Sequence, residues 1–320
     1  MKVHVLALDG VFDTGLATVL DAFGTANELA AATGISAVRF EVTIVGMRRR
    51  ARTAQGLNVP VVSAARLTAP DVAIVPALGA KMPQPLREAL TRRDVGDLRG
   101  LLREWAADGA LLGAACTGTF VLAGTSLLDG HSATTTWWLA PLFRELYPRV
   151  SLDEARMLVA SKRFITAGAA LAHLDLALWV VRRKSPALAD MTARYLVVEP
   201  RPSQGVFVIP DHLAHADPLV ERFEHWARRQ LADGFSLAAA AHAAGTSERT
   251  LARRLRSVLG KSPLSYVQDL RVERAVHLLR TTGSSIDDIA AQVGYADGVT
   301  LRTLLRRRIG RGVRELRARS

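Results

Sequence analysis

The side chain with the most reactive chemistry belongs to Cys116, the chain's one cysteine. It lies in residues 113–119 (GAACTGT), where an apolar run gives way to small residues and then to a helical pattern. A side chain at such a corner projects from the edge of a sheet, and the backbone N–H groups that follow it can hold an anion. A thiol there would act as a nucleophile or line a ligand pocket. Nucleophilic action needs a base or a cation that lowers the pKa of the thiol.

Few groups in the sequence could act on this thiol. His131 follows a turn-forming Asp-Gly pair, and a surface position is its simpler explanation. Asp9 and Asp13 follow the first apolar run, and the alternative for both is to cap the next helix. The residue directly after the cysteine is Thr117, which is no base. We expect no catalytic residue and no cofactor, and leave open a pure dimerisation role. The predicted ligand pocket consists of Asp13, Cys116, Thr117 and Trp137.

The arginines of the last third of the chain are the second group of functional candidates. Residues 217–320 hold 19 Lys and Arg against 11 Asp and Glu, whereas the whole chain holds 42 against 30. Most of the net charge of +12 therefore lies in this third. This distribution is expected of a segment that contacts phosphate.

These arginines lie on a repeated helical pattern. An alanine-rich helix is stopped by Gly245 and a second helix restarts after Ser247, which is the sequence form of a helix-turn-helix. We predict one such unit at about 237–259 and another at about 286–308, with a bridging helix between them. The two units lie about 49 positions apart. The buried faces of their second helices should be Leu251 and Leu255 in the first, and Leu301 and Leu305 in the second.

This tandem resembles the DNA-binding domain of the AraC/XylS regulators. The likeness is carried by residues 247–255 (SERTLARRL), 260–263 (GKSP) with Tyr266, 271–275 (RVERA) and 289–295 (IAAQVGY). It implies binding to double-stranded DNA, with one recognition helix of each unit in a major groove. It also implies base reading by Arg249, Ala252 and Arg253, and a phosphate contact by Lys261. For Arg253, a phosphate or solvent position is the alternative.

The second unit departs from these relatives. Val299, Thr300 and Thr303 should face DNA, with Arg302 and Arg306 beside them. Relatives commonly carry arginine where Thr303 stands, and their Ser-Pro pair is replaced here by residues 310–313 (GRGV). The resemblance therefore does not fix the base specificity of this unit. The arginines at 306, 307, 308 and 311 are expected to meet phosphates, and a solvated face is the alternative.

The first part of the chain alternates strand and helix patterns. Apolar strand-like runs cover 3–8, 40–45, 72–78, 110–115 and 163–166, and helical patterns cover 14–32, 86–92, 98–107, 119–123 and 171–183. Alternation of this kind predicts a mostly parallel sheet with helices on both faces, a flavodoxin-like α/β domain. Ligands bind such sheets at the carboxyl ends of the strands.

Residues 113–119, 127–137, 165–170 and 175–178 resemble the PfpI-like branch of the class I glutamine-amidotransferase-like superfamily. Together with the C-terminal tandem, they make the chain similar to the GlxA-type transcriptional regulators over nearly its full length. Catalytic members of the superfamily usually carry histidine directly after the cysteine, where this chain has Thr117. The resemblance thus implies a regulator whose first domain binds a small effector or dimerises. The alternative is a cysteine hydrolase or amidotransferase-like enzyme with an appended DNA-binding domain.

These patterns divide the chain into an α/β sensor and dimerisation domain (1–185), a linker (186–216) and an all-α DNA-binding domain with two helix-turn-helix units (217–320). The linker contains an irregular stretch with three prolines. His212 and His215 could form half of a metal site, but no Cys or carboxylate motif joins them, so no metal is expected.

Composition and termini limit where the protein acts. A lone cysteine excludes a disulfide framework and a cysteine-based zinc finger. No export signal is visible, and the uncharged stretch 109–128 contains too many Gly and Thr to favour a membrane span. We expect a cytoplasmic homodimer held by residues 1–185. Its expected partners are double-stranded DNA, a small-molecule effector and RNA polymerase.

Overall fold

The computed structural model describes residues 1–35, 38–48, 50–199, 201, 203–207 and 217–317. The chain divides into two compact units, Met1–Gln204 and Gly205–Ser320. The histidine pair His212 and His215 lies outside the described residues. Within the described part, every helix is too short or too polar to span a membrane.

The first unit is built on a seven-stranded sheet with the order β10-β11-β7-β6-β1-β2-β5. All its neighbouring strands run parallel except β10, which pairs antiparallel with β11 at one edge. The strands are β1 (Lys2–Leu6), β2 (Glu41–Gly46), β3 (Arg50–Arg52), β4 (Asn58–Pro60), β5 (Val62–Ser63), β6 (Val72–Val75), β7 (Leu111–Ala115), β8 (Ser132–Ala133), β9 (Ser151–Leu152), β10 (Leu158–Ser161) and β11 (Phe164–Ala167). The predicted α/β fold with a mostly parallel sheet is confirmed.

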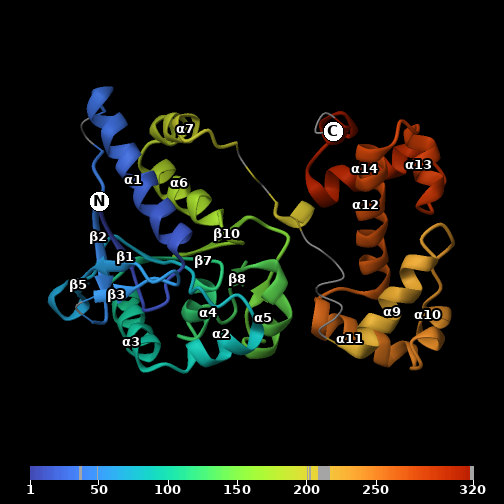
Figure 1. Ribbon diagram of the computed structural model, residues 1–320, viewed down its shortest axis with the longest axis horizontal. Coiled ribbons are helices and arrows are strands. Elements are labelled where there is room, and N and C mark those ends of the chain that lie inside the picture. The colour runs from blue at the N-terminus through green and yellow to red at the C-terminus, as the bar shows by residue number, and fades with distance from the viewer. Residues whose placement is uncertain (36–37, 49, 200, 202, 208–216, 318–320) are drawn as a thin grey trace. The chain divides into compact units, whose positions relative to one another are not determined.

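Helices cover both faces of this sheet (Figure 1). They are α1 (Asp13–Ala32), α2 (Pro83–Leu90), α3 (Arg93–Ala107), α4 (Gly118–Ala123), α5 (Ala140–Leu146), α6 (Ala172–Lys184) and α7 (Pro186–Tyr195). Alternate residues of one strand face opposite sides of a sheet. In β6, Val72 and Ile74 join the core with α1, α6 and α7, whereas Ala73 and Val75 join the core with α2 to α5. Strands buried on both faces explain the near-continuous apolar runs in the sequence.

The first unit extends to Gln204, so the prediction that a linker begins at residue 186 is wrong. Pro186 starts α7 rather than ending structure, because proline fits the first turn of a helix and Ser185 caps the Leu188 N–H. Leu188 and Ala189 are fully buried in the core beside α1 and α6. Gln204 is itself buried, and its amide accepts from the Ala169 N–H at 2.9 Å and donates to the Thr135 carbonyl at 2.8 Å.

The second unit is helical. Its helices are α9 (Pro218–Arg229), α10 (Leu237–Ala243), α11 (Glu248–Leu259), α12 (Pro263–Thr281), α13 (Ile286–Gln292), α14 (Gly298–Ile309) and α15 (Val313–Arg317). The pairs α10–α11 and α13–α14 occupy the ranges expected for the two helix-turn-helix units, and α12 is the bridging helix. Buried Arg271 on α12 donates to the Leu231 and Asp233 carbonyls and lies over the Tyr295 ring, which ties the parts of this unit together.

The two helix-turn-helix units do not repeat at one fixed spacing. Gly245 and Gly294 both turn the chain with positive φ, and they lie 49 positions apart as expected. The caps that start the second helices are Ser247 and Asp297, which lie 50 positions apart. The second turn is therefore one residue longer, and Arg253 corresponds in its helix to Thr303 rather than to Arg302.

Candidate DNA interface and ligand sites

Cys116 lies at the carboxyl end of β7, in a backbone conformation that few non-glycine residues adopt (φ +55°). The Cys116 N–H donates to the Ala167 carbonyl, and the Thr135 hydroxyl donates to the Cys116 carbonyl at 2.7 Å. Gly118 is required at the start of α4, because an added Cβ would lie 2.3 Å from the Val75 carbonyl oxygen. The segment forms the strand-to-helix elbow that the sequence predicted.

The surroundings of the Cys116 thiol disfavour its ionisation. It is buried, and burial raises its pKa above the ordinary value. The nearby Thr117 and Ala170 N–H groups, the Thr136 side chain and the charge of Lys81 act in the opposite direction without reversing this shift. The group is therefore a neutral thiol near pH 7, and thiol nucleophiles react as thiolates.

The four residues of the predicted pocket have different surroundings. Thr117 is buried beside the thiol and donates its hydroxyl to the Leu78 carbonyl at 2.8 Å. Trp137 is largely buried and meets the Trp138 ring edge to face. The Asp13 carboxylate accepts from the Gln55 N–H at 3.0 Å, and it is not among the groups that shift the pKa of Cys116. His131 bonds to Ser161 and is not among them either.

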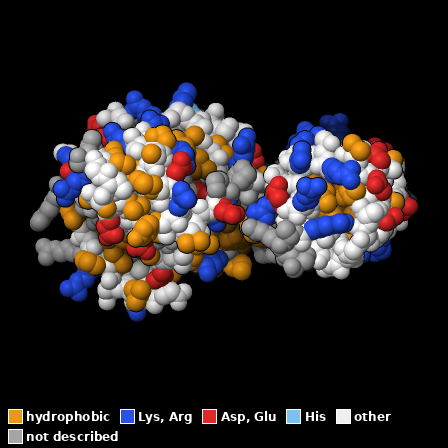
Figure 2. Space-filling view, turned by 90° about the horizontal axis from the view of Figure 1, so that it is seen from above, with side chains coloured by type: hydrophobic (Ala, Val, Ile, Leu, Met, Phe, Trp, Pro, Cys, Tyr) orange, Lys and Arg blue, Asp and Glu red, His pale blue; other side chains and the backbone are white. Residues whose placement is uncertain are grey.

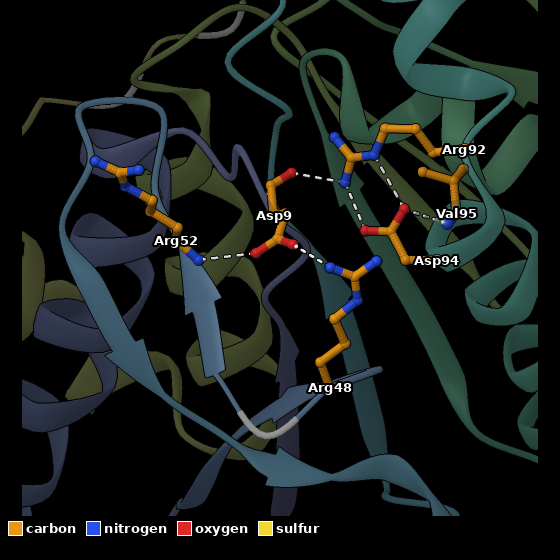
Figure 3. A network of polar contacts seen from close by, with 6 residues as sticks. All are labelled: Asp9, Arg48, Arg52, Arg92, Asp94 and Val95. Atoms are coloured by element: carbon orange, nitrogen blue, oxygen red, sulfur yellow. Dashed lines mark hydrogen bonds and ion pairs between the residues drawn. The ribbon is translucent and has the colours of Figure 1, made fainter.

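Asp9 and Asp13 clamp a hairpin rather than cap a helix, because the N-cap of α1 is Phe12 without a side-chain bond. Figure 3 shows Asp9 at the centre of a polar network. Its carboxylate accepts from the Arg52 N–H at 2.9 Å and from Arg48, and its carbonyl accepts from Arg92 at 2.7 Å. Arg92 also donates to the Asp94 carboxylate, which holds its guanidinium group in place. Burial acts to raise the pKa of Asp94, but the hydrogen bonds and charge of Arg92 hold it below the ordinary value.

The sequence analysis missed His173, the buried residue that positions the elbow loops. Its Nε2 accepts from the Ala77 N–H at 3.0 Å, and Nδ1 bonds to the Ala170 carbonyl. Burial lowers the pKa of His173 to about 4, so the imidazole is neutral and carries its proton on Nδ1. The same Ala170 offers its N–H to the Cys116 thiol. A signal was present, since Gly15 leaves the space that the imidazole fills.

A groove of about 590 Å³ lies on another part of the first unit, between α6, α7 and the residues Val198, Glu199 and Arg201. Leu178, Trp179 and Ala193 give it apolar walls. Its polar groups include the ion pair of Arg201 with Asp175 at 2.5 Å, and Arg194. Burial raises the pKa of Asp175 despite this pairing with Arg201. The volume is in the range of small-molecule pockets.

The first recognition helix, α11, presents the predicted residues. Ser247 caps it by accepting from the Thr250 N–H, and Leu251 and Leu255 are fully buried as predicted. Arg249 and Arg253 are exposed one turn apart, and Ala252 lies half-buried between them. Among the described residues neither arginine has an ion-pair partner. Both guanidinium groups are thus available to a ligand.

The second recognition helix, α14, has the same frame with different side chains. Asp297 caps it, and Leu301 and Leu305 are fully buried as predicted. Val299, Thr300, Arg302, Thr303 and Arg306 are all exposed. Figure 2 shows Lys and Arg side chains gathered on the visible face of the helical unit, with apolar side chains among them.

Two of the predicted phosphate contacts, Lys261 and Arg308, form ion pairs within the domain. Lys261 pairs with Asp269 on α12 at 2.9 Å, and its side chain is only 22% exposed. Arg308 pairs with the same carboxylate at 3.1 Å and donates to Gln268 at 2.8 Å. Both cations therefore fasten the ends of the recognition helices to α12. Arg306 and Arg307 remain exposed on α14.

Comparison with known proteins agrees with this arrangement. Residues 225–319 match the family described as "Helix-turn-helix domain". A solved structure titled as an AraC family transcriptional regulator from Pseudomonas putida is 23% identical with a TM-score of 0.51, and covers 61% of this chain and 98% of its own. The C-terminal unit therefore contains a helix-turn-helix domain. A structure titled as a putative transcriptional regulator from Vibrio parahaemolyticus, 21% identical with a TM-score of 0.52, has a similar fold.

Curated relatives of the chain are transcriptional regulators by name. The HTH-type transcriptional regulator GbdR of Pseudomonas aeruginosa is 27% identical over 215 residues, which are 66% of this chain and 57% of the relative. The HTH-type transcriptional regulator GlxA of Rhizobium meliloti is 28% identical over 227 residues, 68% of each chain. The chain thus spans less than two thirds of the length of some of these relatives.

Proposed function

We propose that the protein is a sequence-specific DNA-binding transcriptional regulator whose first unit senses a small effector and dimerises. The observation that carries this proposal is the pair of capped recognition helices with exposed N-terminal side chains in one helical unit. The bridging helix α12 has 19 residues and is therefore about 28 Å long, which approaches one turn of DNA. Two helices so joined suit successive segments of the major groove.

In the first unit, Arg249 and Arg253 supply donors to base edges, and Ala252 leaves room for their approach. An arginine guanidinium matches the O6 and N7 acceptors of guanine, and we assign this role to Arg253. Arg302, Arg306 and Arg307 on α14 suit contacts to phosphate, which position the domain without reading sequence. Such cations make affinity fall steeply as salt rises.

The groove and the elbow are alternative sites for the effector. Cys116, Thr117 and Trp137 at the elbow are buried, whereas the groove is open and has both apolar walls and charged groups. Val198, Glu199 and Arg201 line the groove shortly before the unit ends at Gln204. We therefore favour the groove, because a ligand there would touch the segment that leads to the DNA-binding unit.

A cysteine hydrolase remains the competing function, and the raised pKa of Cys116 opposes it. Alkylation by iodoacetamide against pH separates the two. We expect slow labelling of the native protein at pH 7 that increases only above the ordinary thiol pKa of about 8.5. A labelling rate that reaches its plateau below that pH would favour the enzyme.

Selection of bound sequences from random double-stranded DNA by the full chain tests the main proposal. We expect an enriched motif with two segments about one helical turn apart. Failure to enrich any motif at moderate salt would contradict sequence-specific binding. A regulator of this kind would act in the cytoplasm, and contact with RNA polymerase would follow if its site lies beside a promoter.

A further inference from the structure

The N-terminal end of α14 exposes a valine. The side chains of Leu301, Leu304, Leu305 and Ile309 are buried, whereas Val299 is 66% exposed. Thr300 and Thr303 are exposed beside it, and Val299 and Thr303 lie one turn apart on the same helix face. An apolar side chain in this position has no packing role inside the domain.

Both threonine hydroxyls already act as hydrogen-bond donors within the helix and its cap. The Thr303 hydroxyl donates to the Val299 carbonyl at 3.0 Å, and the Thr300 hydroxyl donates to the Asp297 carboxylate at 3.3 Å. A hydroxyl has a single proton to donate. The threonines therefore offer methyl groups and oxygen lone pairs to a partner, but no hydrogen-bond donor.

The same helix positions in the first unit carry arginines. Counted from the caps Ser247 and Asp297, Arg249 corresponds to Val299 and Arg253 corresponds to Thr303. The buried leucines correspond as well, since Leu251 and Leu255 match Leu301 and Leu305. The two helices thus share one frame, in which two exposed arginines of α11 are replaced by an exposed valine and an exposed threonine in α14.

We propose that the second unit reads thymine through its C5-methyl group, with Val299 and Thr303 forming the apolar surface that receives it. In the major groove thymine alone presents a methyl group, and apolar side chains and threonine methyls are the groups that contact it. The first unit, with its arginines, reads guanine instead. The proposal rests on the proposed function and adds that the operator is asymmetric, with guanine in one segment and thymine in the other.

Replacement of thymine by deoxyuracil tests this directly, since it removes the methyl group and keeps base pairing. We expect one or two such replacements in the second segment of the selected operator to weaken binding by the full chain roughly three- to tenfold. Replacements in the first segment should leave binding unchanged. There, 7-deazaguanine, which lacks the N7 acceptor, should weaken binding.

Matched substitutions at one position separate the methyl from the hydroxyl. Thr303→Val keeps a methyl group and should preserve discrimination between thymine and uracil. Thr303→Ser keeps the hydroxyl and should reduce it, and Val299→Ala should remove most of the loss that uracil causes. Equal binding of thymine and uracil operators by the wild-type chain, or a second segment without thymine, would overturn the proposal while leaving the regulator function intact. Absence of any selected motif would instead reject the proposed function.

Discussion

Arg253 and Lys261 lie close together in the sequence, but their surroundings differ. Arg253 is exposed, whereas Lys261 is paired with Asp269. We expect Arg253→Ala to cost about 1–3 kcal/mol of binding free energy and to relax the preference at one base position. Quantitative binding to the selected operator and its single-base variants measures both effects. Equal weakening on every sequence would make Arg253 a phosphate contact.

Lys261→Ala is the informative companion to that variant. Because its partner is a carboxylate of the same domain, the change should lower thermal stability and leave the dependence of DNA affinity on salt nearly unchanged. A clear fall in the salt slope would return Lys261 to the DNA interface. The variants thus separate a group that faces outward from one that holds two helices together.

His173 predicts a pH dependence of folding stability. Its pKa is about 4 in the folded chain and near 6.5 when exposed, so the unfolded chain binds more protons between these values. The contribution of a neutral His173 is fully present above about pH 6.5 and is lost as pH falls toward 4, by about 3 kcal/mol at most. Denaturant unfolding across this range measures the loss. His173→Gln should be less stable at pH 7 and should lack this part of the pH dependence; an unchanged profile would contradict the assignment.

Which of these residue roles the sequence could predict depends on how local their causes are. The buried faces at Leu251, Leu255, Leu301 and Leu305 followed from helical periodicity alone. The pairing of Lys261 with Asp269 depends on how α12 packs, and periodicity carries no information about that. The same holds for His173, whose partners lie in loops after two different strands.

The strands and helices also differ in how well the sequence predicts them. The central strands and their helices were predicted because each carries an apolar pattern of its own. Edge strand β10 has three half-buried positions and one exposed position, and gave no such pattern. Helix α7 lies in the range predicted as linker, because proline is common where helices end, although Pro186 fits the start of a helix. The extra residue in the second turn shows only when both caps are located.

The groove between α6 and α7 can be tested as an element. Ala193→Trp should fill it, whereas Ala187→Trp adds the same ring to an exposed position of α7 that does not line the groove. Small metabolites that raise the Tm of the full chain should stop doing so in the first variant and continue in the second, because bound ligand stabilises the folded state. A metabolite that still stabilises Ala193→Trp binds elsewhere, and the elbow is then the site to examine.

At the scale of the whole molecule, we expect a homodimer held by the first unit. Two recognition helices per chain become four in a dimer, and the second chain then binds at a high effective concentration. Since the unit ends at Gln204, residues 1–204 rather than 1–185 should sediment as the dimer and bind no operator. A monodisperse monomer of the full chain at micromolar concentration would count against dimerisation.

The longer second turn affects any redesign of the DNA sequence that this protein recognises. An alignment that matches the two turn glycines shifts every residue of α14 by one place against α11, about 100° around the helix axis. Designs copied in that register would send arginines into the core and leucines toward DNA. Residues copied from α11 to α14 should therefore be aligned by the helix caps, with Ser247 matched to Asp297. The side chains of positions 249 and 253 are then placed at positions 299 and 303.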